Sequence, residues 1–188
     1  MLHRVFIAIN FPEDIKEKLF NFSNKYPHLP ARWVKKENIH ITLSFLGNLD
    51  DNQLLETIET VKKVAVRHSP MFIRLNKICY GPPEKFPPRM VWVKGEENND
   101  LSRLYTDLED SFFKLPSYQY KIKEDRPFSL HITLARIKSF EFRKLAENIE
   151  IKEDLDLNFE VNTIQVIESE LKKTGPEYAL LESVTLTD

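Results

Sequence analysis

The sequence predicts an α+β fold built on antiparallel sheets, and three observations lead to this prediction. Predicted strands outnumber predicted helices, and the two do not alternate as they would in a doubly wound parallel sheet. A similar order of elements occurs on either side of about residue 95, which indicates an internal duplication. The chain also repeats His-Ile-Thr-Leu at residues 40–43 and 131–134, although it contains only five histidines.

Alternating β-branched and aromatic residues predict the strands of the first half. These strands are expected at residues 3–11, 31–34, from His40 onward, 71–80 and 90–94. Between them, a helix starts at Pro12 and ends before Pro27, and a second helix follows a cap at Asp50 or Asp51. The segment 81–89 holds four prolines, which remove backbone donors and exclude regular structure there.

The second half repeats this order after a polar connector at residues 95–100. Leu101, Leu104, Leu108 and Phe112 are spaced as on one face of a helix. A loop rich in Tyr and Lys then leads to the strand at His131. A further helix is expected near residues 140–149, followed by strands around 161–168 and 178–186.

Composition limits the class of protein and its partners. The 188 residues fit one domain of two lobes, here residues 1–95 and 96–188. One cysteine excludes an internal disulfide, and no apolar run approaches the roughly 20 residues that cross a membrane. We therefore expect a cytoplasmic monomer. With a net charge of −2, such a protein would bind nucleic acid locally, at an end, rather than along a tract.

Strand alternation places a histidine and a threonine on the same face in both repeats. His40, Thr42 and Ser44 are expected on one face, with Ile39, Ile41, Leu43 and Phe45 on the other, toward the helices. In the second repeat, His131, Thr133 and Ala135 share a face opposite to Leu130, Ile132 and Leu134. If the halves pack around a pseudo-two-fold axis, the two His-Thr pairs face each other across a cleft.

Such a pair of imidazoles suits phosphodiester cleavage. A neutral imidazole can accept a proton from the attacking group, and an imidazolium can protonate the leaving oxygen. The threonine hydroxyls can donate hydrogen bonds to phosphate oxygens, where negative charge accumulates. No set of residues with the spacing of a metal site accompanies the pair, so neither a metal nor another cofactor is expected.

The motifs also resemble those of a known family, and the resemblance covers nearly the whole chain. "RVFIAINFP", "RWVKKENIHITLSFLGNL", "PRMVWV", "RPFSLHITLARIK" and "ESELKKTGPEYALLESVTL" are similar to segments of the 2H phosphoesterase superfamily. Within it, they resemble the bacterial and archaeal RNA 2',3'-cyclic phosphodiesterases once called 2'-5' RNA ligases. The resemblance implies a bilobal fold, with two antiparallel sheets lining a V-shaped cleft and helices on the outer faces.

The resemblance also implies an activity and roles for five residues. The activity is metal-independent hydrolysis of a terminal RNA 2',3'-cyclic phosphate to a 2'-phosphomonoester. His40 would donate a proton to the 3' oxygen, and His131 would accept one from water. Thr42 and Thr133 would hold the phosphate, with Arg136 nearby. Strict alternation would turn Arg136 away from the cleft, so a β-bulge or the end of the strand would have to redirect it.

The sequence is also compatible with other functions and contains other candidate binding residues. The protein could act on a small cyclic nucleotide or ADP-ribose cyclic phosphate, join RNA ends by the reverse reaction, or bind nucleotides without turnover. RNA phosphates could be contacted by basic residues near the motifs, namely Arg32, Lys35, Lys36, Arg89 and Arg126. Trp33 and Trp92 are expected in the core, and Phe86 is a candidate for stacking on a base.

Overall fold

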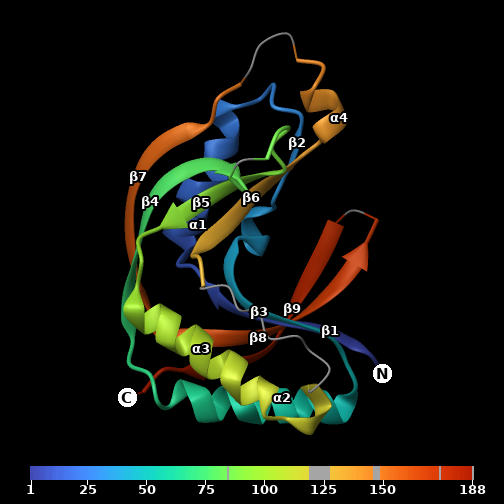
Figure 1. Cartoon of the computed structure of the whole chain (residues 1–188), viewed down its shortest axis with the longest axis vertical. Coiled ribbons are helices and arrows are strands. Elements are labelled where there is room, and N and C mark those ends of the chain that lie inside the picture. The colour runs from blue at the N-terminus through green and yellow to red at the C-terminus, as the bar shows by residue number, and fades with distance from the viewer. Residues whose placement is uncertain (84, 119–127, 146–148, 174, 188) are drawn as a thin grey trace.

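The fold consists of two antiparallel sheets with helices packed against them (Figure 1). The structure is a computed structural model, and it describes residues 1–83, 85–118, 128–145, 149–173 and 175–187. The predicted α+β class with antiparallel sheets is confirmed.

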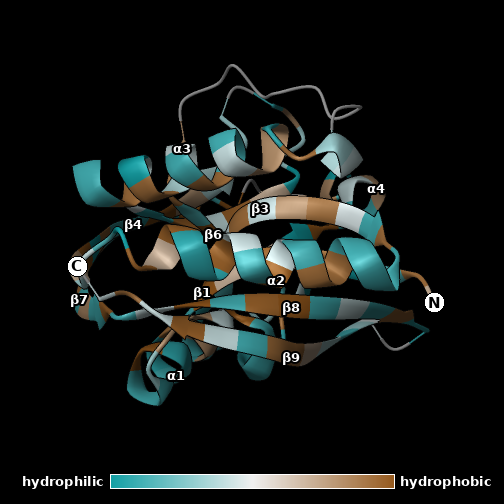
Figure 2. Ribbon diagram, turned by 90° about the horizontal axis from the view of Figure 1, so that it is seen from below, coloured by the Kyte–Doolittle hydropathy of each residue, from teal (hydrophilic) through white to brown (hydrophobic). Residues whose placement is uncertain are grey.

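The four-stranded sheet has the order β3-β1-β8-β9. Its strands are β1 (His3–Asn10), β3 (His40–Leu49), β8 (Thr163–Lys172) and β9 (Gly175–Thr185). Two helices contact it, α2 (Asp51–Ala65) and α3 (Asn99–Phe113), which also pack against each other (Figure 2). Their outer faces are hydrophilic, as expected of helices that cover one side of a sheet.

The five-stranded sheet has the order β2-β6-β5-β4-β7. Its strands are β2 (Ala31–Trp33), β6 (His131–Ile137), β5 (Met90–Gly95), β4 (Met71–Gly81) and β7 (Lys152–Val161). The helix α1 (Glu13–Asn21) lies behind it in Figure 1. Three 3₁₀ turns, η1 (Phe22–Lys25), η2 (Lys36–Asn38) and η3 (Pro116–Tyr118), and the short helix α4 (Ser139–Phe142) complete the described elements.

Local sequence explains where the longer helices begin. The Asp50 carboxylate accepts a hydrogen bond from the Gln53 backbone N–H, and the Gln53 side chain accepts one from the Asp50 N–H, both at 2.9 Å. This capping box satisfies two backbone donors that would otherwise lack partners at the start of α2. Asn98 caps α3 by accepting from the Leu101 N–H at 2.9 Å. The predicted connector at 95–100 therefore ends in a helix cap.

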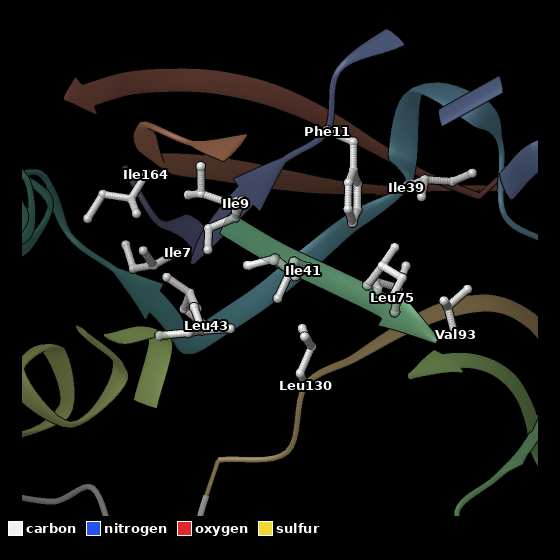
Figure 3. Close-up of a cluster of buried hydrophobic side chains, with 14 of the residues drawn as sticks. Ile7, Ile9, Phe11, Ile39, Ile41, Leu43, Leu75, Val93, Leu130 and Ile164 are labelled. Carbon is white, nitrogen blue, oxygen red and sulfur yellow. The ribbon is translucent and has the colours of Figure 1, made fainter. Parts of the chain in front are cut away.

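One hydrophobic core joins the two sheets. Ile7 and Ile41 of the four-stranded sheet and Leu75 and Val93 of the five-stranded sheet belong to the same buried cluster (Figure 3). Each of these side chains is at most 1% exposed, and burying one contributes about 1.5–3 kcal/mol. Side chains of both sheets therefore pack into the same core, and this packing fixes the position of β3 relative to β6.

The expected division into lobes at about residue 95 needs correction. The first half supplies β1 and β3 to the four-stranded sheet but β2, β4 and β5 to the other, and the second half likewise divides its strands. Each sheet is thus completed by strands from the other half. The sequence repeat and the lobes are different divisions of the chain, because β4 pairs with β5 and β7, while β8 pairs with β1 and β9.

The second half differs from the prediction in three respects. The helix predicted near 140–149 is only the four-residue α4, and residues 146–148 lie outside the described part. The strand β7 was not predicted, although apolar residues alternate with polar ones from Leu155 to Val161. β8 and β9 also extend further toward their connecting turn than expected.

Candidate active site

The strand β3 carries the first repeat and is bulged at the last residue of that repeat. Ala8 of β1 pairs with Thr42 while Ile7 pairs with Ser44, so Leu43 is an extra residue in the ladder. The bulge reverses the alternation of side chains beyond it. Ser44 is consequently buried and donates a 2.6 Å hydrogen bond to Glu109 of α3. Phe45 instead lies opposite Phe6 and is 68% exposed, so the expected orientations of Ser44 and Phe45 are wrong.

His40 is fixed by a hydrogen bond at each ring nitrogen. Its Nδ1 donates to the backbone carbonyl of Asn38 at 2.8 Å, and its Nε2 lies 3.0 Å from the Thr42 hydroxyl. A carbonyl can only accept, so Nδ1 carries the proton and Nε2 is the nitrogen left to exchange one. The predicted pairing of His40 with Thr42 on one face is therefore present as a direct contact.

Aromatic rings enclose His40. Its ring centroid lies 4.9 Å from that of Phe6 and 5.5 Å from that of Tyr178, the latter edge to face. Burial lowers the pKa of His40 below its ordinary value of 6.5, and the positive charge of Lys16 lowers it further, whereas the Asn38 carbonyl opposes both effects. In the free protein at neutral pH, His40 is accordingly a neutral imidazole.

The strand β6 repeats the same bulge at the same place. Trp92 of β5 pairs with Thr133 while Val91 pairs with Ala135, so Leu134 is the extra residue. Ala135 is therefore buried, and Arg136 is exposed on the face that also carries His131 and Thr133. The strand needs this bulge to turn Arg136 to the histidine side, and Arg136 occupies the position that Phe45 holds in the first repeat.

His131 makes the same backbone contact in a different environment. Its Nδ1 donates to the carbonyl of Ser129 at 2.8 Å, again two residues upstream, so Nε2 is the free nitrogen. The ring lies 4.3 Å from Trp92, centroid to centroid, and is otherwise exposed. Thr133 points its hydroxyl toward the Met90 sulfur at 3.9 Å rather than toward the imidazole. Trp92 thus packs against His131 and is not among the residues packed against the main core, contrary to the expectation of a core residue.

We call the sheet faces that carry His40 and His131 the histidine faces. In the four-stranded sheet this face includes Phe6, Ala8, Ile167 and Tyr178, which form a small cluster separate from the main core. β3 and β6 contact each other although they belong to different sheets. Burial raises the pKa of the Tyr178 hydroxyl, and the charges of Arg136 and Arg4 oppose this rise. The positive charge of Arg136 in one sheet therefore acts on the Tyr178 hydroxyl in the other.

Sequence reasoning missed several neighbours of the two histidines. Phe6 could have been found, because it alternates with the core residues of β1. Tyr178 could not, because it reaches His40 only through the β8–β9 hairpin. Asn38 links these parts: its carbonyl holds His40, and its amide donates to the Pro176 carbonyl at 3.0 Å, at the start of β9.

The basic and aromatic candidate residues lie in different parts of the structure. Trp33 packs against Phe22 with ring centroids 6.2 Å apart, as expected of a core residue, and Lys36 is paired with Glu13. Phe86 is 76% exposed, and its ring centroid lies 6.3 Å from that of Phe142, edge to face. Arg32 lies directly opposite Arg136 in the β2–β6 pair. Arg126 lies outside the described residues.

Two other features of the described residues do not form a competing site. No group of three or more His, Cys, Asp or Glu side chains is placed there to hold a metal ion. A hollow of about 740 Å³ lies between the end of α2 and the start of α3. Its charges are already paired, Arg67 and His68 with Asp107 and Arg103 with Asp100. The repeated strands therefore remain the candidate site. No helix in the described part is long and apolar enough to cross a membrane.

Comparisons with known proteins show the family of the chain. The family model of the LigT-like phosphoesterases matches twice, over residues 9–92 and 96–178, one match for each sequence repeat. An RNA 2',3'-cyclic phosphodiesterase of Methanocaldococcus jannaschii is 30% identical over 181 residues, covering 95% of this chain and 98% of that protein. Another protein of this name, from Thermotoga maritima, is 31% identical over 95% of this chain and 92% of its own length.

Solved structures give the same result. The crystal structure of TT0787 of Thermus thermophilus matches with a TM-score of 0.84 and 28% identity, and the match covers 97% of each chain. LigT of Escherichia coli, crystallised with 3'-AMP, has the same fold with a TM-score of 0.75 at 24% identity over the full length of both chains. The chain therefore belongs to the LigT-like phosphoesterases, the family of the RNA 2',3'-cyclic phosphodiesterases.

Proposed function

We propose that this protein hydrolyses the 2',3'-cyclic phosphate at the end of an RNA to a 2'-phosphomonoester, with His40 and His131 as its acid–base pair. One observation carries the proposal. Both histidines donate Nδ1–H to the carbonyl two residues upstream, at 2.8 Å in each case, and so direct Nε2 to the histidine face. A structural histidine would not need this arrangement twice, beside a threonine each time. The names of the full-length relatives supply the substrate class.

In the proposed reaction, water attacks the phosphorus and the bond to the 3' oxygen breaks. His131 Nε2 accepts the proton of the attacking water, and His40 Nε2 gives a proton to the departing 3' oxygen. The proton inventory then balances, and the two imidazoles exchange protonation states during the turnover. They return to their starting states through solvent. Thr42, Thr133 and Arg136 would bind the phosphate oxygens, on which charge increases in the transition state.

The environment of His40 adds a requirement to this scheme. Because burial lowers its pKa, His40 is neutral in the free protein at neutral pH and cannot yet donate a second proton. An anionic phosphate placed beside it favours the imidazolium and raises its pKa. Substrate binding should therefore take up a proton, which calorimetry in buffers of different ionisation enthalpy would detect. A phosphate analogue that binds without proton uptake would contradict the role of His40 as donor.

The activity test compares three substrates in EDTA: an RNA oligomer with a 2',3'-cyclic phosphate end, a cyclic mononucleotide and ADP-ribose cyclic phosphate. We expect turnover of the RNA end to the 2'-phosphate, unchanged by the chelator. Preference for either small substrate would assign the protein to another branch of the 2H superfamily. Binding with no turnover of any of the three would make it a nucleotide-binding module, and addition of RNA with a 5' hydroxyl tests for ligation.

The donor and acceptor roles can be separated by the leaving group. A phosphodiester that releases 4-nitrophenolate needs little help from a proton donor, because this leaving group is stable as an anion. The His40→Ala variant should lose much less activity on this substrate than on the cyclic phosphate, whereas His131→Ala should lose as much on both. The reverse result would exchange the two roles without removing the pair.

A further inference from the structure

Three cations lie together where β6 leaves the histidine face, and nothing in the proposed chemistry requires all of them. Arg32 on the edge strand β2 is directly opposite Arg136 in the ladder. The backbone N–H of Lys138 donates to the Pro30 carbonyl at 2.8 Å, which places Lys138 next to the same end of β2. We call Arg32, Arg136 and Lys138 the basic cluster.

The basic cluster is unusual in its electrostatics. Like charges directly opposite each other in an antiparallel pair destabilise a sheet. All three residues are exposed, and none forms an ion pair with any residue in the described part of the chain. In a protein with a net charge of −2, three neighbouring cations without a carboxylate indicate a surface that receives an external anion.

The position of the cluster indicates which anion. Along β6, Arg136 comes three residues after Thr133, and β2 lies about 5 Å to the side, at the edge of the sheet. Arg136 and then Arg32 therefore lie progressively further from the His131–Thr133 pair, toward the edge of the sheet. An RNA chain that left the site in that direction would next present the phosphate that links its last two nucleotides.

We propose that Arg32, supported by Lys138, binds the phosphodiester that precedes the terminal nucleotide, so that the protein selects RNA ends over free cyclic nucleotides. Arg136 lies between the two phosphates and can contact either. This inference rests on the proposed function, because it takes the cyclic phosphate to be held by His40, His131 and the two threonines. It names a residue, Arg32, that would determine substrate size and take no part in the bond cleavage.

The test measures kcat and KM for cytidine 2',3'-cyclic phosphate and for a dinucleotide that ends in the same group. Arg32→Gln should raise KM for the dinucleotide roughly tenfold to a hundredfold, the effect of losing one charged hydrogen-bonded contact. Both constants for the mononucleotide should stay within about twofold of the wild type. Arg32→Lys should retain part of the selectivity, and Lys138→Gln should show the same pattern with a smaller loss.

A matched control and a salt series complete the experiment. Arg103→Gln removes the same charge from α3, on the side of the protein away from β2, and should change neither substrate. For the dinucleotide, the plot of log affinity against log salt has a negative slope. In Arg32→Gln this slope should become shallower by about 0.7, as expected for one lost phosphate contact on a single strand. Equal losses on both substrates, or no loss on the dinucleotide, would overturn the inference.

Failure of the proposed function would look different. In that case the wild type would cleave neither substrate, whatever the state of Arg32. The same variants would then be compared by calorimetric binding of cytidine 2'-phosphate and of the dinucleotide ending in a 2'-phosphate. Loss of dinucleotide selectivity in Arg32→Gln supports the basic cluster in this assay, and unchanged selectivity overturns it.

Discussion

The two copies of His-Ile-Thr-Leu share a backbone but not an environment. Both strands hold their histidine by the carbonyl two residues upstream, and both are bulged at the leucine. His40, however, is enclosed by Phe6 and Tyr178 and contacts Thr42, whereas His131 rests on Trp92 and is exposed. The duplicated strand therefore supplies two imidazoles in matching orientation, and the residues around them differentiate the two.

The fifth residue after each histidine shows the same divergence. The bulge turns Phe45 to the histidine face in the first copy and Arg136 in the second. One copy thus presents an aromatic ring where the other presents a cation. A symmetric backbone can in this way build a site for an asymmetric substrate, with different groups on its two sides.

The largest effects are expected from removing either histidine. His40→Ala and His131→Ala should each lower kcat/KM on the RNA substrate by roughly 10²–10⁴-fold, because each proton transfer needs its own imidazole. The double variant should be little slower than the slower single variant, since the residues act as a unit. Losses that multiply in the double variant would show that the two histidines act independently.

Replacing the threonines should sharpen the difference between the copies. Thr42→Val and Thr133→Val each remove one phosphate contact and should each slow turnover by about tenfold. Thr42 also contacts the His40 Nε2 atom, and Thr133 does not contact His131 in this way. Only Thr42→Val should therefore shift the limb of the pH–rate profile that belongs to His40. Equal shifts in both variants would remove this distinction.

The burial of His40 can be reduced without touching the reacting groups. Tyr178→Ala opens the edge of the imidazole to water, and since burial is the main cause of the low pKa, the pKa of His40 should rise toward 6.5. NMR titration of the imidazole would measure the shift. Leu171→Ala, an exposed apolar residue on β8, serves as the control and should leave the titration unchanged.

The smallest effects concern stability, where two histidines should show opposite signs. Hydrogen bonds that His3 donates to the Asp51 and Glu168 carboxylates raise the pKa of His3. The contribution of His3 to stability is therefore complete below pH 6.5 and is lost as the pH rises through the folded-state pKa. The pKa of His40 is lowered, so its contribution is present above pH 6.5 and is lost as the pH falls toward the folded-state pKa.

Denaturant unfolding from pH 5 to pH 8.5 would test these signs. His3→Gln should lower the free energy of unfolding, and this decrease should become smaller as the pH rises. A loss in His3→Gln that grew with pH would contradict its contacts with the two carboxylates.

The sequence was sufficient for every described strand except β7, for the repeat, and for placing each histidine on the same face as a threonine. It was not sufficient for Ser44 and Phe45, because a bulge depends on the partner strand and not on the local alternation. It also misplaced the boundary between lobes, since long-range strand pairing divides the strands of each half between the two sheets. Tyr178 and Trp92 were not assigned to the site for the same reason: their contacts with the histidines form only when distant strands pair.

The pH dependence of kcat/KM on a cyclic-phosphate-ended RNA, measured for the wild type and for each His→Ala variant, tests the central claim most directly. Hydrolysis by this pair needs one imidazole neutral and the other protonated in the same molecule, so the wild type should give a bell. One limb should lie below pH 6.5, because burial lowers the pKa of His40. Each variant should lose most of its activity together with its bell. A variant that kept near-wild-type turnover would show that its missing histidine is structural and that the two repeats do not act as a pair.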